Sequence, residues 1–584
     1  MDGLSVGKDG GLLIVRSRYE DRAVVKSIGA RWDKGNRYWT LPFTVESVQA
    51  VTSNLDYMTP GAEIERLLRE QQAKEEKLAR IKLLSTRDTP ICLKVPGVRL
   101  SLYNYQKLGV LFAVTNGDGV LIADSMGLGK SIEAIGAACY MKSRGECEHC
   151  LVVTPASLKW NWPIEIEKFT NEKYVVIDGT PDDRVGQWLD QEPFFYIVNF
   201  ALVLEDLFGG REFKIKEDDD ELAIDRKMRQ MEKAQERAEL LAPVRGRTWP
   251  AVIIDEIHYL KNSSAKRTQN IRKLDARFRM GLSGTPLDGK LEDLHSVMEF
   301  IKPGLLGTKT SFLQRHADFD FWGKVTGYRN IGEVRRKIEP FFIRRLKKDV
   351  LTELPDKVYE NRYVVLSPQE KKIYKQLASR GHEITEDEEA VVAVIRCKQF
   401  CDYPGLIDID TRRCSKLEAW LEIIDELVVE NGEQVLVFSQ YATMNEALID
   451  ELDGLGVKYR YICGDTPNRE RVEIQNEFVS DSSIKVLVGT DAMSLGLNLV
   501  AAVYVINYDD AWSPSVMEQR EDRCHRIGQK HQVTVVNFIV KDTIEERIRS
   551  VLYDKARVSA DALGDETEEM VLRRMGPKDI ARLL

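Results

Sequence analysis

A glycine-rich stretch between an apolar run and a helical pattern carries the residue types that hold a nucleotide phosphate. It follows Val120–Ala123 and consists of Asp124, Ser125, Met126, Gly127, Leu128, Gly129, Lys130 and Ser131. Glycines let backbone N–H groups approach a phosphate, and the N-terminus of the next helix attracts its negative charge. In such loops the lysine reaches the outer phosphates and the hydroxyl binds Mg²⁺. The strict pattern begins with glycine, where this chain has Asp124, but the flanking strand and helix disfavour a chance Gly-Lys-Ser. We therefore expect ATP to be bound by Asp124, Met126, Gly127, Leu128, Gly129, Lys130 and Ser131.

Two adjacent carboxylates further along the chain offer the second half of such a site. The apolar run Ala251–Ile254 ends in Asp255 and Glu256. At this position an aspartate holds Mg²⁺, usually through water, and a glutamate orients or deprotonates the attacking water. Taken alone, the pair also fits strand-end charges at a solvated turn. Together with the glycine-rich loop, it predicts a hydrolytic site in which Lys130, Asp255 and Glu256 are catalytic and Ser131 and Asp255 hold the metal.

Two arginines near the C-terminal end are suited to the charge that develops during phosphoryl transfer. Arg523 and Arg526 are three residues apart in a stretch that we predict to be helical, so both should lie on one face. Opposite a phosphate site, they would act as arginine fingers. Isolated arginine pairs are commonly solvated, but the flanking Gln519 and His525 disfavour that interpretation here.

The composition is that of a folded protein with a large core. The chain has 584 residues, of which 43% are hydrophobic and 30% charged, a balance that excludes long disordered stretches. Its length predicts roughly four structural units. No apolar run approaches the ~18 residues of a membrane span, and no basic region precedes the first apolar patch, so we expect neither a membrane protein nor a secreted one. Nine scattered cysteines indicate a reducing compartment rather than a disulfide scaffold.

The net charge is −9, which is opposite in sign to that of a simple basic DNA-binding protein. A local basic cleft can still dominate an acidic whole. A nucleic-acid partner must therefore be argued from particular residues.

Short apolar runs alternate with longer amphipathic stretches in two separate series. Strands are predicted at 120–123, 151–154, 196–199 and 251–254, and again at 434–439, 459–463, 485–488, 502–506 and 533–539. Continuous Val/Ile/Leu strands of this kind belong to parallel sheets that are buried on both faces. We therefore predict an α/β fold with two RecA-like P-loop lobes, parallel sheets and helical insertions, together with a small α+β N-terminal module.

The chain divides into five predicted segments. The small N-terminal module spans 1–60, and a charged linker helix, with its helical pattern at Glu63–Lys82, spans 61–90. Lobe 1 is expected at 91–357 with a charged insert at 206–246, lobe 2 at 358–548 with a helical protrusion at 358–415, and a helical tail at 549–584. We expect the region 289–394 to be largely helical.

Further motifs follow in order and resemble those of the Snf2 family of superfamily 2 DNA translocases. The loop at 124–131 resembles motif I, Asp255–His258 motif II and Ser283–Pro286 motif III. The remaining matches are 102–106 for the Q motif, 154–160 for motif Ia, 342–350 with 354–355 for the inter-lobe segment, 437–440 for motif IV, 496–499 for motif V and 519–529 for motif VI. The resemblance covers about 92–548, and Met-Gly-Leu-Gly-Lys and His-Arg-Ile-Gly-Gln are its most specific strings.

The resemblance implies a motor that hydrolyses ATP when duplex DNA fills the cleft between its lobes. It implies that Gln106 reads the adenine and that Ser283, Thr285 and Gln519 couple the ATP site to the DNA side. Phosphate contacts are independent of sequence, which suits an enzyme that moves along any DNA. The residues matched to DNA-contacting positions are Thr154, Ser157, Lys159, Asn199, Ser439, Gln440 and Thr490.

Motif V departs from the family pattern. The usual Arg/Lys-Ala-Gly-Gly is here Asp491-Ala-Met493-Ser494, which replaces a basic residue with an acid and puts the DNA role of this loop in doubt. Ser125 and Ile257 replace the usual Glu and Ala, but neither touches a proposed catalytic group.

The N-terminal module resembles the small aromatic-rich modules that precede the motor in the annealing-helicase, or fork-remodelling, branch of the Snf2 family. The match consists of Arg31, Trp32, Arg37, Tyr38 and Trp39. Such a basic and aromatic mixture binds branched or single-stranded DNA. It fits equally well a tiny domain whose few aromatic side chains form its core.

Two other features have ordinary structural explanations. Trp160, Trp162 and Trp512 are expected in the core, because duplex DNA keeps its bases stacked and needs no stacking platform. Cys147 and Cys150 form one CxxC pair, but a structural zinc site needs four ligands and the chain has no second pair.

Three functions remain open from the sequence. The first is an ATP-dependent translocase that remodels duplex DNA or protein–DNA complexes, with fork regression or strand annealing as one form. The second is a strand-separating or RNA-directed superfamily 2 helicase, and the third is a catalytically degenerate DNA-bound scaffold. For the first, we expect ATP and Mg²⁺ as cofactors, duplex or branched DNA as partner, and a location in the bacterial or viral host-cell cytoplasm or in a eukaryotic nucleus.

Overall fold

The computed structural model describes residues 3–7, 12–43, 45–55, 57–58, 60–85, 91–209, 221–284, 291–321, 323, 325–351, 353–382, 387–409, 413–494, 496–511 and 514–549. The chain forms two compact units, residues 1–83 and 84–584. Except for Arg549, the helical tail predicted at 549–584 lies outside the described residues, as do Thr285 and Trp512.

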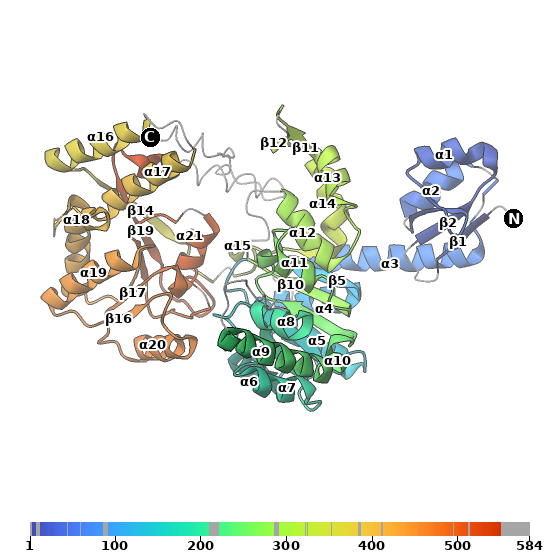
Figure 1. The fold of residues 1–584 in the computed structure, drawn as a ribbon, viewed down its shortest axis with the longest axis horizontal. Helices are drawn as coiled ribbons and strands as arrows, with labels where there is room; N and C mark the ends of the chain where they lie inside the picture. Colours follow the sequence, from blue (N-terminus) through green and yellow to red (C-terminus); the bar gives the residue numbers. More distant parts are fainter. Residues whose placement is uncertain are drawn as a thin grey trace. The chain divides into compact units, whose positions relative to one another are not determined.

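The first unit is a small antiparallel sheet covered by helices (Figure 1). Its strands, in the spatial order β1-β2-β4-β3, are β1 (Gly3–Val6), β2 (Leu12–Arg16), β4 (Tyr38–Pro42) and β3 (Arg31–Asp33). Alternation along β2 points Leu13 and Val15 inward, where they meet α1 (Arg22–Ser27) and α2 (Val45–Asn54). The charged helix predicted at Glu63–Lys82 is α3 (Ala62–Ser85), whose Ile64 joins the same core.

The second unit begins with a lobe built on seven parallel strands. In spatial order these are β13 (Phe342–Ile343), β5 (Gly119–Ile122), β10 (Ala276–Leu282), β9 (Trp249–Ile254), β6 (Cys150–Thr154), β8 (Phe195–Asn199) and β7 (Tyr174–Val176). Strand β10 was not predicted because two arginines interrupt its apolar pattern, and β7 and β13 were not predicted because they are very short.

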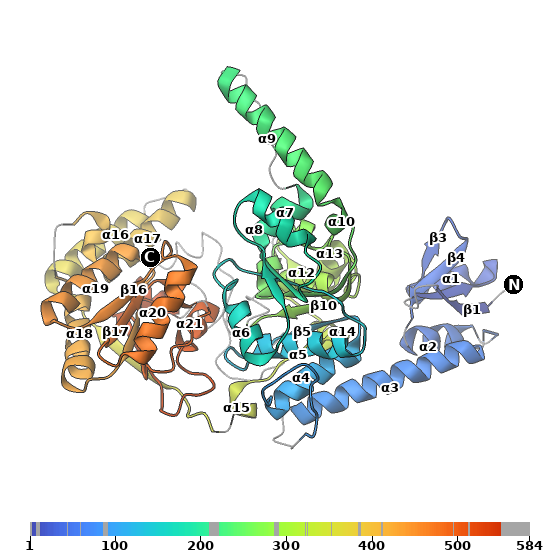
Figure 2. The same ribbon diagram turned by 90° about the horizontal axis from the view of Figure 1, so that it is seen from below.

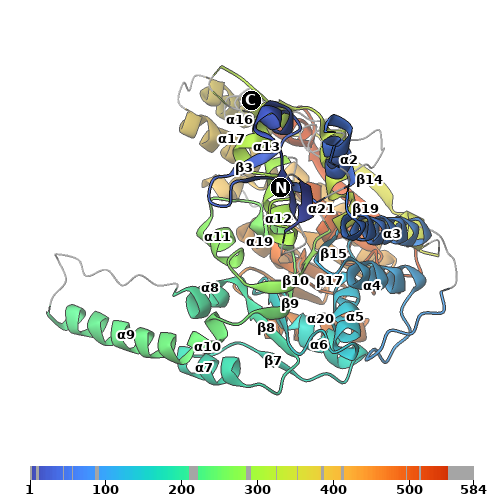
Figure 3. The same ribbon diagram turned by 90° about the vertical axis from the view of Figure 1, so that its right-hand side faces the viewer.

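Helices of this lobe connect the strands. They are α4 (Asn104–Asn116), α5 (Lys130–Ser143), α6 (Asn161–Phe169), α7 (Pro181–Leu189), α8 (Phe200–Phe208), α10 (Ala242–Arg245), α11 (Lys266–Ile271), α12 (Leu291–Ile301), α13 (Lys309–His316), α14 (Ile331–Ile338) and α15 (Lys347–Val350). Of these helices, α4, α5, α6, α8 and α12 pack against the sheet. In the charged insert predicted at 206–246, α9 (Glu221–Leu240) extends away from α7 and α8 (Figures 2 and 3).

A second lobe has six parallel strands. Their spatial order is β14 (Val358–Val364), β19 (Thr534–Val540), β18 (Tyr504–Asn507), β15 (Val435–Phe438), β17 (Val486–Gly489) and β16 (Tyr459–Ile462). The helices are α16 (Pro368–His382), α17 (Asp387–Asp402), α18 (Ser415–Ile424), α19 (Ala442–Leu455), α20 (Asn468–Ser480) and α21 (Pro514–Glu521).

Alternation along β15 shows how helices cover both faces of this sheet. Val435 and Val437 pack with residues of α18 and α19, such as Trp420, whereas Leu436 and Phe438 pack in a separate cluster with residues of α20. Burial on both faces explains why the strands are apolar without interruption.

The predicted fold class is confirmed, with two parallel α/β lobes and a small α+β unit. The described part of 289–394 is largely helical, as expected, and it also contains the hairpin β11 (Ala317–Phe319) and β12 (Val325–Tyr328), β13 and β14. Within the described residues, no helix has the length and apolar character to cross a membrane.

Candidate active site

The glycine-rich loop connects the end of β5 to the start of α5. Gly127 and Gly129 have φ angles of 82° and 88°, a left-handed conformation that side chains disfavour, so the loop requires glycine at both positions. Nζ of Lys130, the first residue of α5, donates to the carbonyl oxygen of Asp124 over 2.9 Å. The helix N-terminus and the lysine therefore meet at the loop, as phosphate binding requires.

Helix α4 braces this loop from the side. The Tyr105 hydroxyl and Nε2 of Gln106 both donate to the carbonyl oxygen of Leu128, over 2.8 and 2.9 Å. Oε1 of Gln106 accepts from the backbone N–H of Tyr103 over 3.0 Å. A Cβ atom at position 129 would lie 2.5 Å from Nε2 of Gln106, so glycine also makes room for this amide. Both ends of the Gln106 amide thus have partners within the protein, and adenine recognition by Gln106 stays a prediction.

Asp255 follows β9 and is held in place by three donors. Its Oδ2 accepts from Nε1 of Trp162 over 2.9 Å and from Oγ1 of Thr154 over 3.2 Å, and its Oδ1 accepts from the N–H of Glu256 over 3.0 Å. Burial, and then the neighbouring charge of Glu256, raise the pKa of Asp255 to about 6. Two adjacent buried carboxylates favour a cation beside them, and oxygen ligands are those that Mg²⁺ prefers, so this site fits the metal predicted from the sequence.

Glu256 is linked to the end of β10 through His258. Nδ1 of His258 lies 3.1 Å from Oε2 of Glu256 and 3.3 Å from Oγ of Ser283. Burial raises the pKa of Glu256, but nearby His258 and the charges of Lys130 and Arg523 together outweigh burial and hold that pKa below its ordinary value. Glu256 is therefore ionised near neutral pH, as a group that polarises water must be.

Ser283 itself lies beside the phosphate loop. Its N–H donates to the carbonyl of Ile122, the last residue of β5, over 3.1 Å. A Cβ atom at Gly284 would lie 2.5 Å from Cγ of Met126 and 3.5 Å from Nζ of Lys130. The structure thus brings Ser283 and the loop together, while Thr285 lies outside the described residues.

Arg523 and Arg526 come from lobe 2 and lie against the same loop. Nη2 of Arg523 is 3.9 Å from Sδ of Met126, and a Cβ atom at Gly127 would lie 2.7 Å from Cβ of Arg526. Nη1 of each arginine donates to the carbonyl of Leu497, over 3.2 and 2.8 Å. Both arginines therefore reach the phosphate loop from the opposite lobe.

The prediction that these arginines lie on a helix is wrong. Helix α21 ends at Glu521, and the following residues form turns in which the N–H of Arg526 donates to the carbonyl of Cys524. Gln519, a predicted coupling residue, accepts at its carbonyl oxygen from Nε of Arg523. The turns, rather than a shared helix face, bring the two guanidinium groups together.

Several predicted DNA-contacting side chains of lobe 1 have partners inside the protein. Thr154 is fully buried and donates to Asp255. Nζ of Lys159 lies 2.9 Å from Oδ1 of Asp178, and this lysine is 4% exposed. Asn199 caps the N-terminus of α8 with its side chain. In this structure these three groups hold lobe 1 together and do not form an open phosphate-binding surface.

The predicted DNA-contacting residues of lobe 2 also include side chains with partners inside the protein. Ser439 is fully buried, and its hydroxyl donates to Oδ2 of Asp509 over 2.5 Å. The N–H of Gln440 donates to the same carboxylate over 3.0 Å. Thr490, and Ser157 of lobe 1, are partly exposed. The DNA contacts of all these residues stay predictions.

Two asparagines that were not predicted as site residues join the lobes. Nδ2 of Asn161, at the start of α6, donates to the carbonyl of Gly496 over 2.9 Å, and Nδ2 of Asn468 donates to the carbonyl of Ala156 over 2.7 Å. A Cβ atom at Gly496 would collide with Asn161 and Leu158. Asparagine carries no charge or periodic signal, so nothing in the sequence marked these two.

The tryptophans and cysteines have structural positions. Trp162 is 2% exposed, as expected for the core, but Trp160 is 39% exposed. Cys147 and Cys150 are both buried, and burial raises the pKa of each thiol. Among the described residues, no three His, Cys, Asp or Glu side chains are placed to hold a metal ion.

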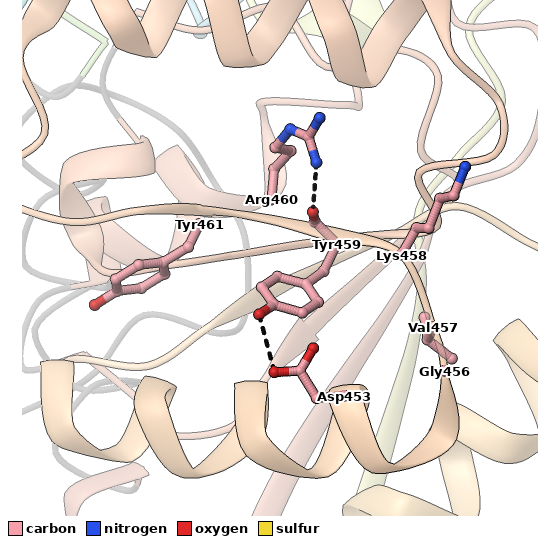
Figure 4. A pocket seen from close by; sticks show the side chains of 7 residues that line it. All are labelled: Asp453, Gly456, Val457, Lys458, Tyr459, Arg460 and Tyr461. Atoms are coloured by element: carbon pink, nitrogen blue, oxygen red, sulfur yellow. Dashed lines mark hydrogen bonds between the residues drawn. The ribbon is translucent and has the colours of Figure 1, made fainter.

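An open cavity of about 640 Å³ lies at the edge of the lobe 2 sheet (Figure 4). It is lined by Val457–Tyr461 of β16 and its approach, with Asp453 and Gly456 at the end of α19. The Tyr459 hydroxyl donates to Oδ2 of Asp453 over 3.3 Å. No predicted site residue lines this cavity.

Two family profiles and several curated proteins match this chain. The profile of the SNF2-related domain matches residues 72–406, and that of the helicase conserved C-terminal domain matches 415–528. An uncharacterized ATP-dependent helicase of Mycoplasma pneumoniae is 30% identical over 80% of this chain and 42% of its own length. A putative ATP-dependent helicase/translocase of Bacillus subtilis is 29% identical over 83% of this chain and 51% of its own length. The chain thus spans about half the length of these curated relatives.

Among solved structures, the SWI2/SNF2 ATPase core of Sulfolobus solfataricus in complex with dsDNA is 27% identical. The match covers 82% of this chain and 96% of that one, with a TM-score of 0.37.

Proposed function

The chain belongs to the SNF2-related family, whose profile spans more than half of its length, and we propose that it is an ATP-dependent translocase on duplex DNA. One observation carries the proposal. Arg523 and Arg526 of lobe 2 lie against the phosphate loop of lobe 1, which leads into α5 at Lys130. Hydrolysis that requires residues from both lobes depends on how the lobes meet, so it can drive a step along DNA.

In this proposal each group at the site has a separate task. Lys130 binds the outer phosphates, and Glu256 polarises the attacking water while His258, Lys130 and Arg523 together hold its pKa low. Arg523 and Arg526 stabilise charge on the transferred phosphoryl group. Ser131 and Asp255 would hold Mg²⁺, which neutralises phosphate charge when it is bound.

Duplex DNA is the proposed partner for two reasons. A curated relative that matches most of this chain is called a helicase/translocase. Motifs IV, V and VI of lobe 2 meet around Arg520, which bonds to Asp491 and to the backbone of Asp509. Such a network transmits a change at the arginines to the surface that DNA would contact, and we propose that Ser283 and Gln519 belong to the same coupling path.

Fork remodelling is the finer form of the proposal and concerns the N-terminal unit. Trp32 is 47% exposed, and its ring lies 5.2 Å from that of Trp39. The guanidinium of Arg16 lies 5.3 Å from the ring of Tyr38, and Arg31 and Arg37 are exposed. An exposed aromatic ring among arginines favours single-stranded or branched DNA, where bases are open to stacking. An enzyme of this kind works where DNA is kept, in a bacterial or viral host-cell cytoplasm or in a nucleus.

ATP turnover on different nucleic acids tests the proposal. We expect duplex DNA to stimulate ATP hydrolysis at least tenfold, and we expect the protein to displace a triplex-forming strand from duplex DNA in an ATP-dependent manner. Stimulation by RNA alone, or separation of strands without triplex displacement, would favour a strand-separating helicase. No turnover with any nucleic acid would favour a degenerate scaffold.

A further inference from the structure

We propose that Arg345 is a positioning residue for the phosphate loop: it neutralises the carboxylates of Asp124 and Glu133 and so keeps Lys130 directed to the nucleotide. The inference rests on the proposed ATP site and assigns it a residue from the far end of lobe 1. The motif resemblance placed Arg345 within the inter-lobe segment without giving it a task.

Arg345 is fully buried and forms several hydrogen bonds with the carboxylate of Asp124. Its backbone N–H and its Nε both donate to Oδ1 of Asp124 over 3.0 Å, and Nη2 donates to Oδ2. Nη2 also donates to Oε2 of Glu133, on α5, over 2.6 Å. The carbonyl of Arg345 accepts from the N–H of Ser125 over 3.0 Å. One arginine thus fixes both the first residue of the loop and the helix that follows it.

The same contacts explain why Asp124 stands where the strict loop pattern has glycine. The side chain of Asp124 is turned toward Arg345, while its carbonyl oxygen accepts from Nζ of Lys130. Arg345 therefore positions the very peptide group that holds the lysine. Pairing of β13 with β5, through the N–H of Ala123 and the carbonyl of Ile343, sets this arrangement.

Helix α4 has a glycine where it packs against the cluster of Asp124, Glu133 and Arg345. Gly109 is buried in the middle of α4, where glycine costs about 1 kcal/mol relative to alanine. A Cβ atom there would collide with the Glu133 carboxylate and would lie 3.0 Å from Nη2 of Arg345. Nη1 of Arg345 also donates to the carbonyl of Tyr105, whose hydroxyl braces the loop at Leu128.

Arg345 balances negative charge close to Lys130. With both carboxylates ionised, Asp124 and Glu133 carry two negative charges and Arg345 one positive charge, so the cluster has a net charge of −1. Burial raises the pKa of Glu133 well above its ordinary value, and the charge of Arg345 is the largest influence that opposes this rise. Without Arg345 the two buried carboxylates would stand uncompensated next to the Lys130 ammonium. The ammonium would then pair with the carboxylates and be drawn from the phosphates. A purely structural arginine would have no such effect on nucleotide affinity.

The experiment compares four full-length proteins. ATP affinity is measured with a fluorescent ATP analogue and Mg²⁺, KM and kcat by DNA-stimulated ATP turnover, and stability by thermal melting. We expect Arg345→Met to weaken nucleotide binding at least tenfold. Adding Glu133→Gln restores the net charge of −1, so the double variant should recover most of the affinity.

The chain offers a matched control in Arg184. It is a buried arginine of lobe 1 that pairs with Asp206 over 2.7 Å, and neither residue contacts the phosphate loop in the described structure. Arg184→Met should lower the melting temperature and leave the affinity of the folded protein within twofold of wild type.

Several results would overturn the proposal. They are an unchanged affinity in folded Arg345→Met, no recovery in the double variant, and an equal loss of affinity in Arg184→Met. If Arg345→Met does not fold, Arg345→Lys replaces it. Lysine cannot bridge both carboxylates as the guanidinium does, so we expect weaker binding by about threefold or more, and wild-type affinity would contradict the proposal. Absence of ATP binding in the wild-type protein would overturn the proposed function as well, whereas a defect confined to the variants concerns Arg345 alone.

Discussion

Oδ1 of Asp491 accepts a 2.7 Å hydrogen bond from Nε of Arg520, an arginine with no exposed surface. Asp491 stands where the Snf2 family usually has a base, and Arg520 belongs to motif VI. The acid therefore has an internal partner: it ties motif V to motif VI and offers no positive charge to DNA. Nη1 of Arg520 also donates to the carbonyl of Asp509, whose carboxylate receives Ser439 of motif IV.

Asp491→Ala should lower the free energy of unfolding by about 1–3 kcal/mol, because it leaves a buried guanidinium short of an acceptor. Asp491→Lys restores the usual family charge but should be the more destabilising change, since it places a second positive charge beside Arg520. Urea denaturation measures both. If Asp491→Lys is as stable as wild type, the ion pair between Asp491 and Arg520 does not stabilise the protein.

Glu256→Gln should retain ATP binding and lower turnover by about 10²–10⁴, because it removes the carboxylate that we propose polarises water and leaves Asp255 in place. Lys130→Ala should instead lose ATP hydrolysis while DNA affinity stays largely intact. Fluorescent-nucleotide binding, single-turnover hydrolysis and DNA mobility shifts separate the two effects. Wild-type turnover in Glu256→Gln would contradict the role assigned to this carboxylate.

Arg526→Ala should lower kcat far more than it raises KM for ATP, because an arginine finger acts on charge that develops in the transition state. Fingers of this type contribute about 10³–10⁵ in kcat in related enzymes. Steady-state ATP turnover at saturating duplex DNA gives the number. A loss below roughly tenfold would leave Arg526 a structural role through its bond to Leu497.

His525 should make stability depend on pH in the acid range. Burial lowers its pKa from 6.5 to about 4, and its Nε2 lies 2.8 Å from the carbonyl of Pro355. Between these values the unfolded chain binds a proton that the folded chain does not, so the free energy of unfolding should fall as pH falls from about 6.5 to about 4. Each unit of the pKa shift corresponds to about 1.4 kcal/mol.

His525→Gln keeps a donor for the Pro355 carbonyl but does not titrate. Chemical denaturation at several pH values should therefore show a shallower acid dependence for this variant than for wild type. Equal slopes in the two proteins would mean that His525 is protonated in the folded state as readily as in the unfolded one.

Removal of the N-terminal unit should spare ATP turnover on plain duplex DNA and reduce turnover and annealing on forked DNA. All motor motifs lie after residue 100, and residues 1–83 form a compact unit of their own. The structure selects Trp32, with Arg31 and Arg37, for point substitution, since Trp39 packs against the core of the unit. Equal losses on every DNA form would contradict a role in fork recognition, and so would no loss on any.

The sequence by itself determined the elements that depend on local order. A strand, two glycines and a lysine at a helix start specify the phosphate loop within a dozen residues, because backbone φ angles and the helix N-terminus are local properties. Uninterrupted apolar strands likewise predicted two parallel sheets, since burial on both faces leaves no polar positions to hide the pattern.

Tertiary structure alone decided how distant charges pair. Asp124 meets Arg345 across 221 residues of sequence, and Asp491 meets Arg520 only because motifs V and VI fold onto one another. The predicted helix for Arg523 and Arg526 failed because carbonyls of neighbouring segments, such as that of Leu497, hold these side chains in turns. Which buried charges meet depends on which segments lie side by side in the fold. The spacing of residues along the chain does not reveal those neighbours.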